Sequence, residues 1–402
     1  MTNARTLPHA MLLAVFLAAA LFAGGGAFAA DTRDFHDHFP QYPGFSQYFA
    51  ANPPASSPPS GAEQVLLVRF RPRFLSPKDH PGMIDFYGDY IAKGRLYNGD
   101  GKLLAEKVTR ELLNTHKDNP AAVFVHEAES AKAATPVVYG RIDRDTVDFG
   151  GGVKRRFTFL RYHAVFRQSG LPAGVTGWRA FLLSLTGDLQ DWRQLDNTTA
   201  ATVVLDEQER PVALMLQPHS YMRTFVFGID VALPADERVK IDVAIRSNEL
   251  YPHVEGRVHY RAVRFLGEEG MRYMLGGTDR PTMSADDITD SARETDYSLQ
   301  FLAPADAFYT FKGHLGQKRA MIGRQGPPGA DYNTLPELKP MAMQLMAGYW
   351  HRDRAGDRER FEATYAKTGD LRDFARVQLP HLAAALAAAH EKQPRAPVQP
   401  AK

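Results

Sequence analysis

Apolar residues in the middle of the chain recur at every second position or in short continuous runs, a pattern that predicts strands. In residues 156–166 (RFTFLRYHAVF) the face that begins at Thr158 is almost continuously apolar, and the other face carries Arg161 and His163. Side chains alternate between the two faces of a strand, so we expect the apolar face to lie against the core.

Further strands are expected at regular short intervals, without regular helices between them. Such spacing is typical of a β-sandwich, and the polar loop 206–210 joins two of these strands as a hairpin. The expected strands are residues 64–70, 136–142, 202–205, 212–216, 224–231, 239–245 and 258–265.

Helical spacing appears in two places. Residues 103–113, after a predicted hairpin turn at 97–102, have apolar residues at helical spacing, and the C-terminal part predicts helices at 335–349, 358–367 and 380–392. We expect Pro380 in the first turn of the last helix, where proline is well tolerated. The methionines of the first C-terminal helix, Met341, Met343 and Met346, are interpreted as core packing.

The two ends of the chain do not look like parts of the fold. A basic residue, a short apolar run and Ala27-Phe28-Ala29 predict a signal peptide cleaved after Ala29. The predicted organisation is a signal peptide (1–29), a Pro/Ser-rich linker (30–62), a β-sandwich domain (63–330), a helical C-terminal segment (331–392) and a disordered tail (393–402). Together these features predict a periplasmic or secreted protein of mainly β structure.

Composition narrows the classes of partner. The net charge is +2 with acids and bases interleaved, so the sequence gives no basic surface for nucleic acid. The chain has no cysteine, and an exported fold of this kind must depend on a buried core rather than on disulfides. After signal cleavage no transmembrane segment is expected, and the expected partner is a small molecule or an envelope component.

Three polar segments adjoin predicted strands and carry the candidate site. They are residues 187–196 (GDLQDWRQLD), 216–221 (LQPHSY) and 246–253 (RSNELYPH). Loops gather at the ends of a sandwich, so distant segments can meet there. The predicted binding residues are Asp188, Asp191, Trp192, Arg193, His219, Tyr221, Arg246, Asn248, Glu249, Tyr251 and His253.

Two interpretations of these segments stay open. Asp188 and Asp191, with His219 as a nitrogen ligand or general base, suit a divalent cation such as Mg²⁺, Ca²⁺ or Mn²⁺. In the other interpretation both aspartates accept backbone N–H bonds in a turn, Trp192 fills the core, and His219 is a structural histidine. The second interpretation implies no cofactor.

The order of these motifs resembles a known family. Asp191-Trp192, a hairpin, His219-Ser220 and then Ser247 with Tyr251-Pro252 resemble bacterial and fungal proteins related to vacuolar protein sorting-associated protein sixty-two. The resemblance covers about residues 136–253. More distantly the chain resembles the necrosis-inducing-like secreted proteins, which implies a β-sandwich with a divalent metal.

The departures from the family pattern fall on the metal site. The family's glutamate after tryptophan is Arg193 here, its next histidine is Gln194, and the histidine of the third motif is Asn248. A cation among metal ligands would repel an ion, whereas Arg193 can pair with Asp188 or Asp191. The resemblance therefore implies a site whose geometry is kept and whose metal has been lost.

Three functions remain as hypotheses, and whether the chain is an enzyme stays open. The favoured one is a non-catalytic binding or envelope-associated protein, with Trp192, Tyr221 and Tyr251 as apolar contacts and arginines for anionic groups. The alternatives are a divalent-metal-dependent hydrolase and, by distant resemblance alone, a membrane-damaging toxin-like protein.

Overall fold

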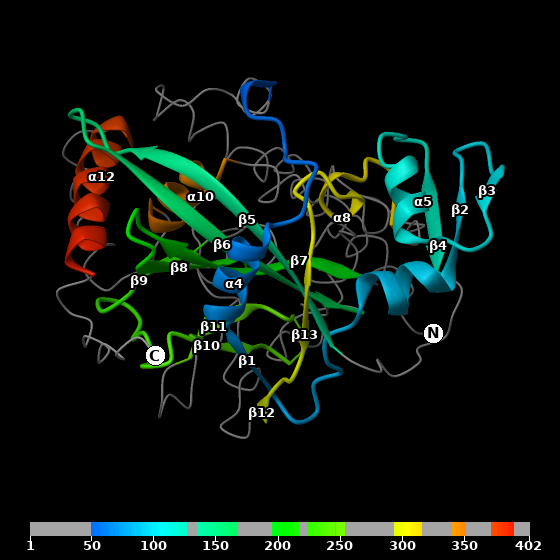
Figure 1. Cartoon of the computed structure of the whole chain (residues 1–402), viewed down its shortest axis with the longest axis horizontal. Coiled ribbons are helices and arrows are strands. Elements are labelled where there is room, and N and C mark those ends of the chain that lie inside the picture. The colour runs from blue at the N-terminus through cyan, green and yellow to red at the C-terminus, as the bar shows by residue number, and fades with distance from the viewer. Residues whose placement is uncertain are drawn as a thin grey trace, which may run out of the picture.

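The described part of the chain folds mainly into strands, with fewer residues in helices (Figure 1). The computed structural model describes residues 50–126, 136–167, 195–217, 223–245, 247–253, 293–315, 340–350 and 371–389. The expectation of a mainly β protein is confirmed. The predicted signal peptide, the C-terminal tail and the strand at 258–265 lie outside the described residues.

The largest sheet has six strands in the order β13-β5-β6-β7-β8-β9. Neighbours are antiparallel except β13 and β5, which run parallel. The β5–β6 connection turns through Gly150, Gly151 and Gly152, all at positive φ, a backbone conformation that glycine adopts without steric cost. The strands are β5 (Val137–Asp148), β6 (Lys154–Phe166), β7 (Asp196–Leu205), β8 (Pro211–Gln217), β9 (Arg223–Val226) and β13 (Ser298–Phe301).

A second sheet of four strands has the order β11-β10-β1-β12 and mixes parallel and antiparallel pairs. In it β1 pairs in parallel with β10 and antiparallel with β12, so the sheet joins segments that are far apart in the sequence. The strands are β1 (Arg73–Ser76), β10 (Lys240–Val243), β11 (Leu250–Pro252) and β12 (Arg293–Glu294).

A third, three-stranded sheet has the order β3-β2-β4 and lies on the side of the molecule away from the C-terminal helices (Figure 1). The predicted hairpin turn is confirmed between β2 and β3, where Asn98 N–H donates to Lys102 O at 2.8 Å. The elements of this part are a π-helical turn η2 (Phe86–Tyr90), a 3₁₀ turn η3 (Ile91–Lys93), β2 (Gly94–Tyr97), β3 (Leu103–Ala105), α5 (Arg110–Thr115), β4 (Val123–His126) and α8 (Ala307–Thr310).

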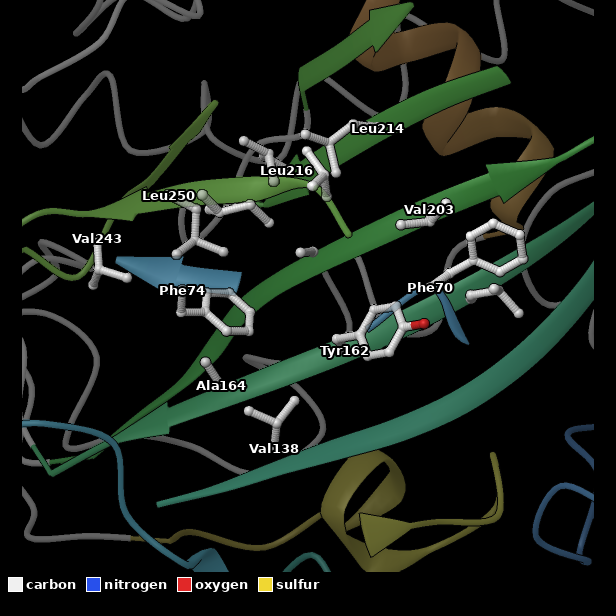
Figure 2. Packing of buried hydrophobic residues seen from close by; sticks show 14 of the residues in the cluster. Phe70, Phe74, Val138, Tyr162, Ala164, Val203, Leu214, Leu216, Val243 and Leu250 are labelled. Atoms are coloured by element: carbon white, nitrogen blue, oxygen red, sulfur yellow. The ribbon is translucent and has the colours of Figure 1, made fainter. Parts of the chain in front are cut away.

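Both faces of the six-stranded sheet are covered. One face packs against α10 (Met341–Trp350) and α12 (Leu371–Ala388) in a single apolar cluster. The other face shares a second cluster with α4 (Gly61–Arg69) and with the four-stranded sheet. Figure 2 shows this second cluster, with Phe74, Val243 and Leu250 of the smaller sheet beside Leu216 and Ala164 of the larger one.

The expectation that the apolar face of residues 156–166 lies against the core is confirmed, and the opposite face is buried as well. Every residue from Phe159 to Phe166 is buried, so the face with Arg161 and His163 is also inside. The physical reason is that α10 and α8 cover this face, and Arg161 donates hydrogen bonds to α10 there. Met341, Met343 and Met346 are buried in α10, as the core interpretation predicted.

Three predicted elements differ in type or position. Residues 64–70 belong to helix α4 rather than to a strand, because Glu63 Oε2 accepts the Ser60 N–H at 2.7 Å and so caps the first turn. The helix predicted at 103–113 begins only at Arg110, where the Thr109 hydroxyl accepts the Leu112 N–H, and β3 precedes it. Pro380 lies inside α12, not in its first turn.

Among the helices of the described residues, none combines the length and the apolar character needed to cross a bilayer.

Two substitutions in α4 distinguish a helix from the strand that the sequence predicts. Leu67 is fully buried whereas Val65 is 66% exposed; in a strand, two residues spaced by two would share a face. We expect Leu67→Ala to lower the free energy of unfolding by about 2–5 kcal/mol and Val65→Ala to change it by less than about 0.5 kcal/mol, measured by urea denaturation. Equal losses in both variants would contradict the helix.

Candidate functional site

Two of the three predicted site segments meet at the start of β7. Asp196 ends the segment 187–196 and begins β7, and Asn248 lies in the turn between β10 and β11. Asn248 Nδ2 donates to Asp196 Oδ2 at 2.9 Å, although the residues are 52 positions apart. Both side chains are buried, so this contact is made inside the protein.

A bulge in β7 determines the face of the sheet to which the Asp196 side chain points. Ala164 of β6 pairs with Thr199, but Phe166 pairs with Asp196, so β7 carries one extra residue between these pairs. The extra residue reverses the alternation of faces, and it places Asp196 on the same face as Thr199 and Phe166, toward the four-stranded sheet. The Thr199 hydroxyl donates to Asp196 Oδ1 at 3.2 Å, which a regular strand would not permit for residues three apart.

His80 extends this contact into a chain of side chains. Its Nδ1 accepts the Gly82 N–H at 2.9 Å, so the ring proton is on Nε2, which lies 3.1 Å from Asn248 Oδ1. Asn248 then donates to Asp196. We call His80, Asn248 and Asp196 the β7–β11 polar chain; in it each group donates to the next, from imidazole to amide to carboxylate.

The imidazole of His80 is held neutral. Burial is the largest influence and lowers the pKa of His80 to about 4, whereas the Asn248 hydrogen bond and the charge of Asp196 act in the opposite direction. The ring of His80 also meets the ring of Phe166 edge-on, with centroids 5.3 Å apart. At neutral pH His80 is therefore an uncharged hydrogen-bonding group and a weak base.

The backbone of Asn248 is in the left-handed region, with φ of 59°. Two backbone bonds close the turn around it, from Asn248 N–H to Ala244 O at 3.2 Å and from Ala244 N–H to Glu249 O at 3.0 Å. Asparagine tolerates this conformation better than most residues. The strained turn points the amide of Asn248 inward.

The other described candidates of the third segment are Glu249, Tyr251 and His253, which follow Asn248 in the sequence. Glu249 is buried, and the Tyr251 hydroxyl donates to Glu249 Oε2, so Tyr251 is turned inward at 2% exposure. His253 is partly exposed, and its Nδ1 lies 2.9 Å from Asp242 Oδ1 on β10. The segment thus places a second buried carboxylate, Glu249, directly after Asn248.

The remaining predicted site residues belong to stretches of the sequence beyond the described ranges. Gln217, at the end of β8, pairs with Ala200 of β7, and the described chain stops there before the second segment continues. Seven predicted residues lie outside the described residues, namely Asp188, Asp191, Trp192, Arg193, His219, Tyr221 and Arg246.

Sequence reasoning missed His80 and did not select Asp196. His80 is followed by Pro81-Gly82, a turn signal that marks an ordered loop but gives no sign of a partner far along the chain. Asp196 was part of the quoted segment, yet its inward direction depends on the β7 bulge. Within the described ranges no group of three or more His, Asp or Glu side chains is arranged to hold a metal ion.

No protein-family model, no curated protein and no solved structure matches this chain.

The low pKa of His80 predicts how the free energy of unfolding depends on pH. In the unfolded chain histidine takes up a proton near pH 6.5, whereas in the fold it does so only near pH 4, so the unfolded state binds more protons between these values. Stability linked to His80 is therefore complete above about pH 6.5 and is lost as the pH falls toward 4. We expect His80→Gln to flatten the slope of unfolding free energy against pH in this window, by at most one proton, about 1.4 kcal/mol per pH unit.

Proton NMR of the wild type checks the same point directly. The imidazole resonance that disappears in His80→Gln identifies His80, and it should titrate with a midpoint near 4. A midpoint near 6.5 would rule out the buried, hydrogen-bonded ring.

Proposed function

We propose that this chain is an exported, non-catalytic binding protein of the periplasm or the extracellular medium. Its proposed architecture is a β-sandwich core with a helical C-terminal segment packed on it. Three features support that architecture: the apolar cluster shared by the two larger sheets, the position of α10 and α12 on the opposite face, and the strand-rich middle of the chain.

We place the binding site at the β7–β11 polar chain and the loops that adjoin it. Support comes from three constraints that act on one place: the bulge that directs Asp196, the left-handed backbone of Asn248, and the burial of Asp196, Asn248 and Glu249. Strained backbone and bulges concentrate at functional sites, where they fix the direction of side chains. The sequence-based candidates Trp192, Arg193, His219, Tyr221 and Arg246 stay part of this proposal.

The hydrogen bonds and the low pKa of His80 are the observation that favours a binding function over a catalytic one. Both of its ring nitrogens are engaged, by Gly82 and by Asn248, and its pKa is about 4. A general base works best with a pKa near the operating pH and with a nitrogen directed at the substrate. The described imidazole is suited to holding Asn248 and Asp196 in place for a polar ligand.

A divalent-metal-dependent hydrolase is the second candidate, and one observation favours it. Asp196 and Glu249 are both buried carboxylates, and Glu249 directly follows Asn248, which donates to Asp196. Carboxylate oxygens are preferred ligands of Mg²⁺, Ca²⁺ and Mn²⁺. In that candidate Asp188, Asp191 and His219 would supply further ligands or the base.

Metal addition and removal separate the two candidates. For a non-catalytic binding protein we expect no change in Tm with Mg²⁺, Ca²⁺, Mn²⁺ or EDTA, and elemental analysis of the purified protein should find no stoichiometric metal. A bound ion would instead raise the Tm by mass action, and Asp191→Ala or Asp196→Asn would abolish that rise. Asp100→Asn, on the exposed β2–β3 turn, is the control; a rise that Asp191→Ala removes and Asp100→Asn keeps would overturn the proposal.

Export is tested separately, by the N-terminus of the mature protein. We expect mass spectrometry of the envelope or medium fraction to find a chain that begins at Ala30, because small residues precede the predicted cleavage point. Ala27→Asp should leave an uncleaved precursor. A wild-type chain that keeps Met1 in that fraction would contradict cleavage.

A further inference from the structure

The covered face of the six-stranded sheet contains a second group of polar side chains, beneath α8 and α10. None of them belongs to the β7–β11 polar chain, and all are at most 3% exposed. We call them the sheet-face polar cluster: Arg161, His163, Thr202, Gln217, Tyr309 and Gln344.

Strand register and hydrogen bonds bring the members together. Arg161 stands opposite Thr202 of β7, and it donates from Nε to His163 Nε2 at 3.0 Å. Its other nitrogens donate to Gln344 Oε1 on α10 at 3.3 Å and to Gln217 Oε1 on β8. The rings of His163 and Tyr309 lie edge to face, with centroids 5.0 Å apart. Six residues from five elements thus form one connected group.

The cluster has more donors than described acceptors. His163 Nε2 accepts from Arg161, so the ring proton sits on Nδ1, and this Nδ1–H is buried without a partner among the described residues. The hydroxyls of Thr202 and Tyr309 are buried without a partner in the same part of the chain. Unsatisfied buried donors are uncommon in native interiors, and this cluster has three of them.

The local charge favours an anion over a cation. Arg141 of β5 stands opposite Arg161, and its guanidinium carbon lies 4.4 Å from the centre of the Tyr309 ring. Burial, and then the charges of Arg161 and Arg141, hold the pKa of His163 well below its usual range, so the ring stays neutral. Arg141 is paired with Asp143 Oδ2 at 2.9 Å, whereas Arg161 donates to His163, Gln344 and Gln217. A guanidinium group with neutral donors beside it matches an anion with several oxygen acceptors.

We propose that the sheet-face polar cluster binds a small oxyanion, a carboxylate or phosphate group, through His163 Nδ1, the Thr202 hydroxyl and the Tyr309 hydroxyl. The side chains are closed to solvent, so the anion is enclosed between the sheet and the helices and enters when the protein folds or opens locally. Arg161 provides the positive potential around it.

Variants that remove one unpartnered hydroxyl test this site. Thr202→Val and Tyr309→Phe delete a buried donor and keep the shape, so without anion we expect them to be as stable as the wild type or more stable. Tyr162→Phe is the matched control, because Tyr162 is on β6 beside Arg161 but points to the other face and donates to Leu67 O at 2.9 Å. The control should lose stability and keep the anion response.

The measurement is the urea midpoint at constant ionic strength, as sodium acetate or sodium phosphate replaces sodium chloride. Phosphate stabilises folded proteins in general, so the result is the difference between the wild type and each variant. We expect the wild-type and Tyr162→Phe midpoints to rise and saturate, and the apparent Kd to increase at least about tenfold in Thr202→Val and Tyr309→Phe. A response to acetate alone identifies a carboxylate site, and a response to phosphate alone identifies a phosphate site.

Ion chromatography gives an independent readout. Denaturing the wild type after extensive desalting should release an oxyanion in stoichiometric amount, and the two variants should release less. An identical anion response in all four proteins, with no released anion, would overturn the proposal and leave an internal water or another part of the chain as the acceptor.

Discussion

Everything else in this structure depends on the six-stranded sheet being buried on both faces. Residues 159–166 of β6 are buried without exception, because the four-stranded sheet and α4 cover one face while α10 and α8 cover the other. Neighbouring side chains of a strand point to opposite faces, so a strand covered twice takes all of its residues into the interior. Any polar residue in such a strand must then find its partners inside the protein.

Arg161 shows how this constraint shapes the packing of α10. Its guanidinium donates hydrogen bonds to residues of β6, β8 and α10. Two further hydrogen bonds, each of 2.9 Å, hold the same helix: the Thr224 hydroxyl donates to Leu345 O, and the Ala342 N–H donates to Asp145 Oδ2. Apolar contacts alone would let a methionine-rich helix slide along a sheet, since methionine adapts to many surfaces. Directed hydrogen bonds fix the position of α10 instead. Buried ionic groups seldom add net stability over apolar residues of the same size, so their value here lies in defining one arrangement.

The sequence was sufficient to predict the parts of the fold that depend on local patterns. The alternation in residues 156–166, the three glycines of the β5–β6 turn and the Asn-Gly and Asp-Gly turn before β3 identify strands and hairpins directly. Prediction failed where a short apolar run admits two structures. Residues 64–70 form a helix because of a cap at Ser60 and Glu63, and a run of this length has no period that separates helix from strand.

The candidate site was less predictable, because its geometry depends on contacts between distant residues. Nothing near His80 in the sequence indicates Asn248 as its partner, and nothing near Asn248 indicates Asp196. The face on which Asp196 lies depends on a single additional residue in β7, and the apolar pattern of Ala200–Leu205 continues unchanged on the other side of it. Pattern reasoning assigns faces by counting in twos, so one bulge reverses every assignment beyond it.

The same bulge explains how one strand serves two polar groups. Thr202 stands opposite Arg161 and faces α10, and Thr199 lies on the other face by ordinary alternation. The bulge beyond Thr199 brings Asp196 to that same face, toward the four-stranded sheet and Asn248. Without the extra residue Asp196 would point to the face of Arg161 and could not accept the hydrogen bond from Asn248. The bulge therefore decides which buried amide is the partner of Asp196, whereas the arginines on the other face have a carboxylate of their own, because Asp143 Oδ2 lies 2.9 Å from Arg141 Nε.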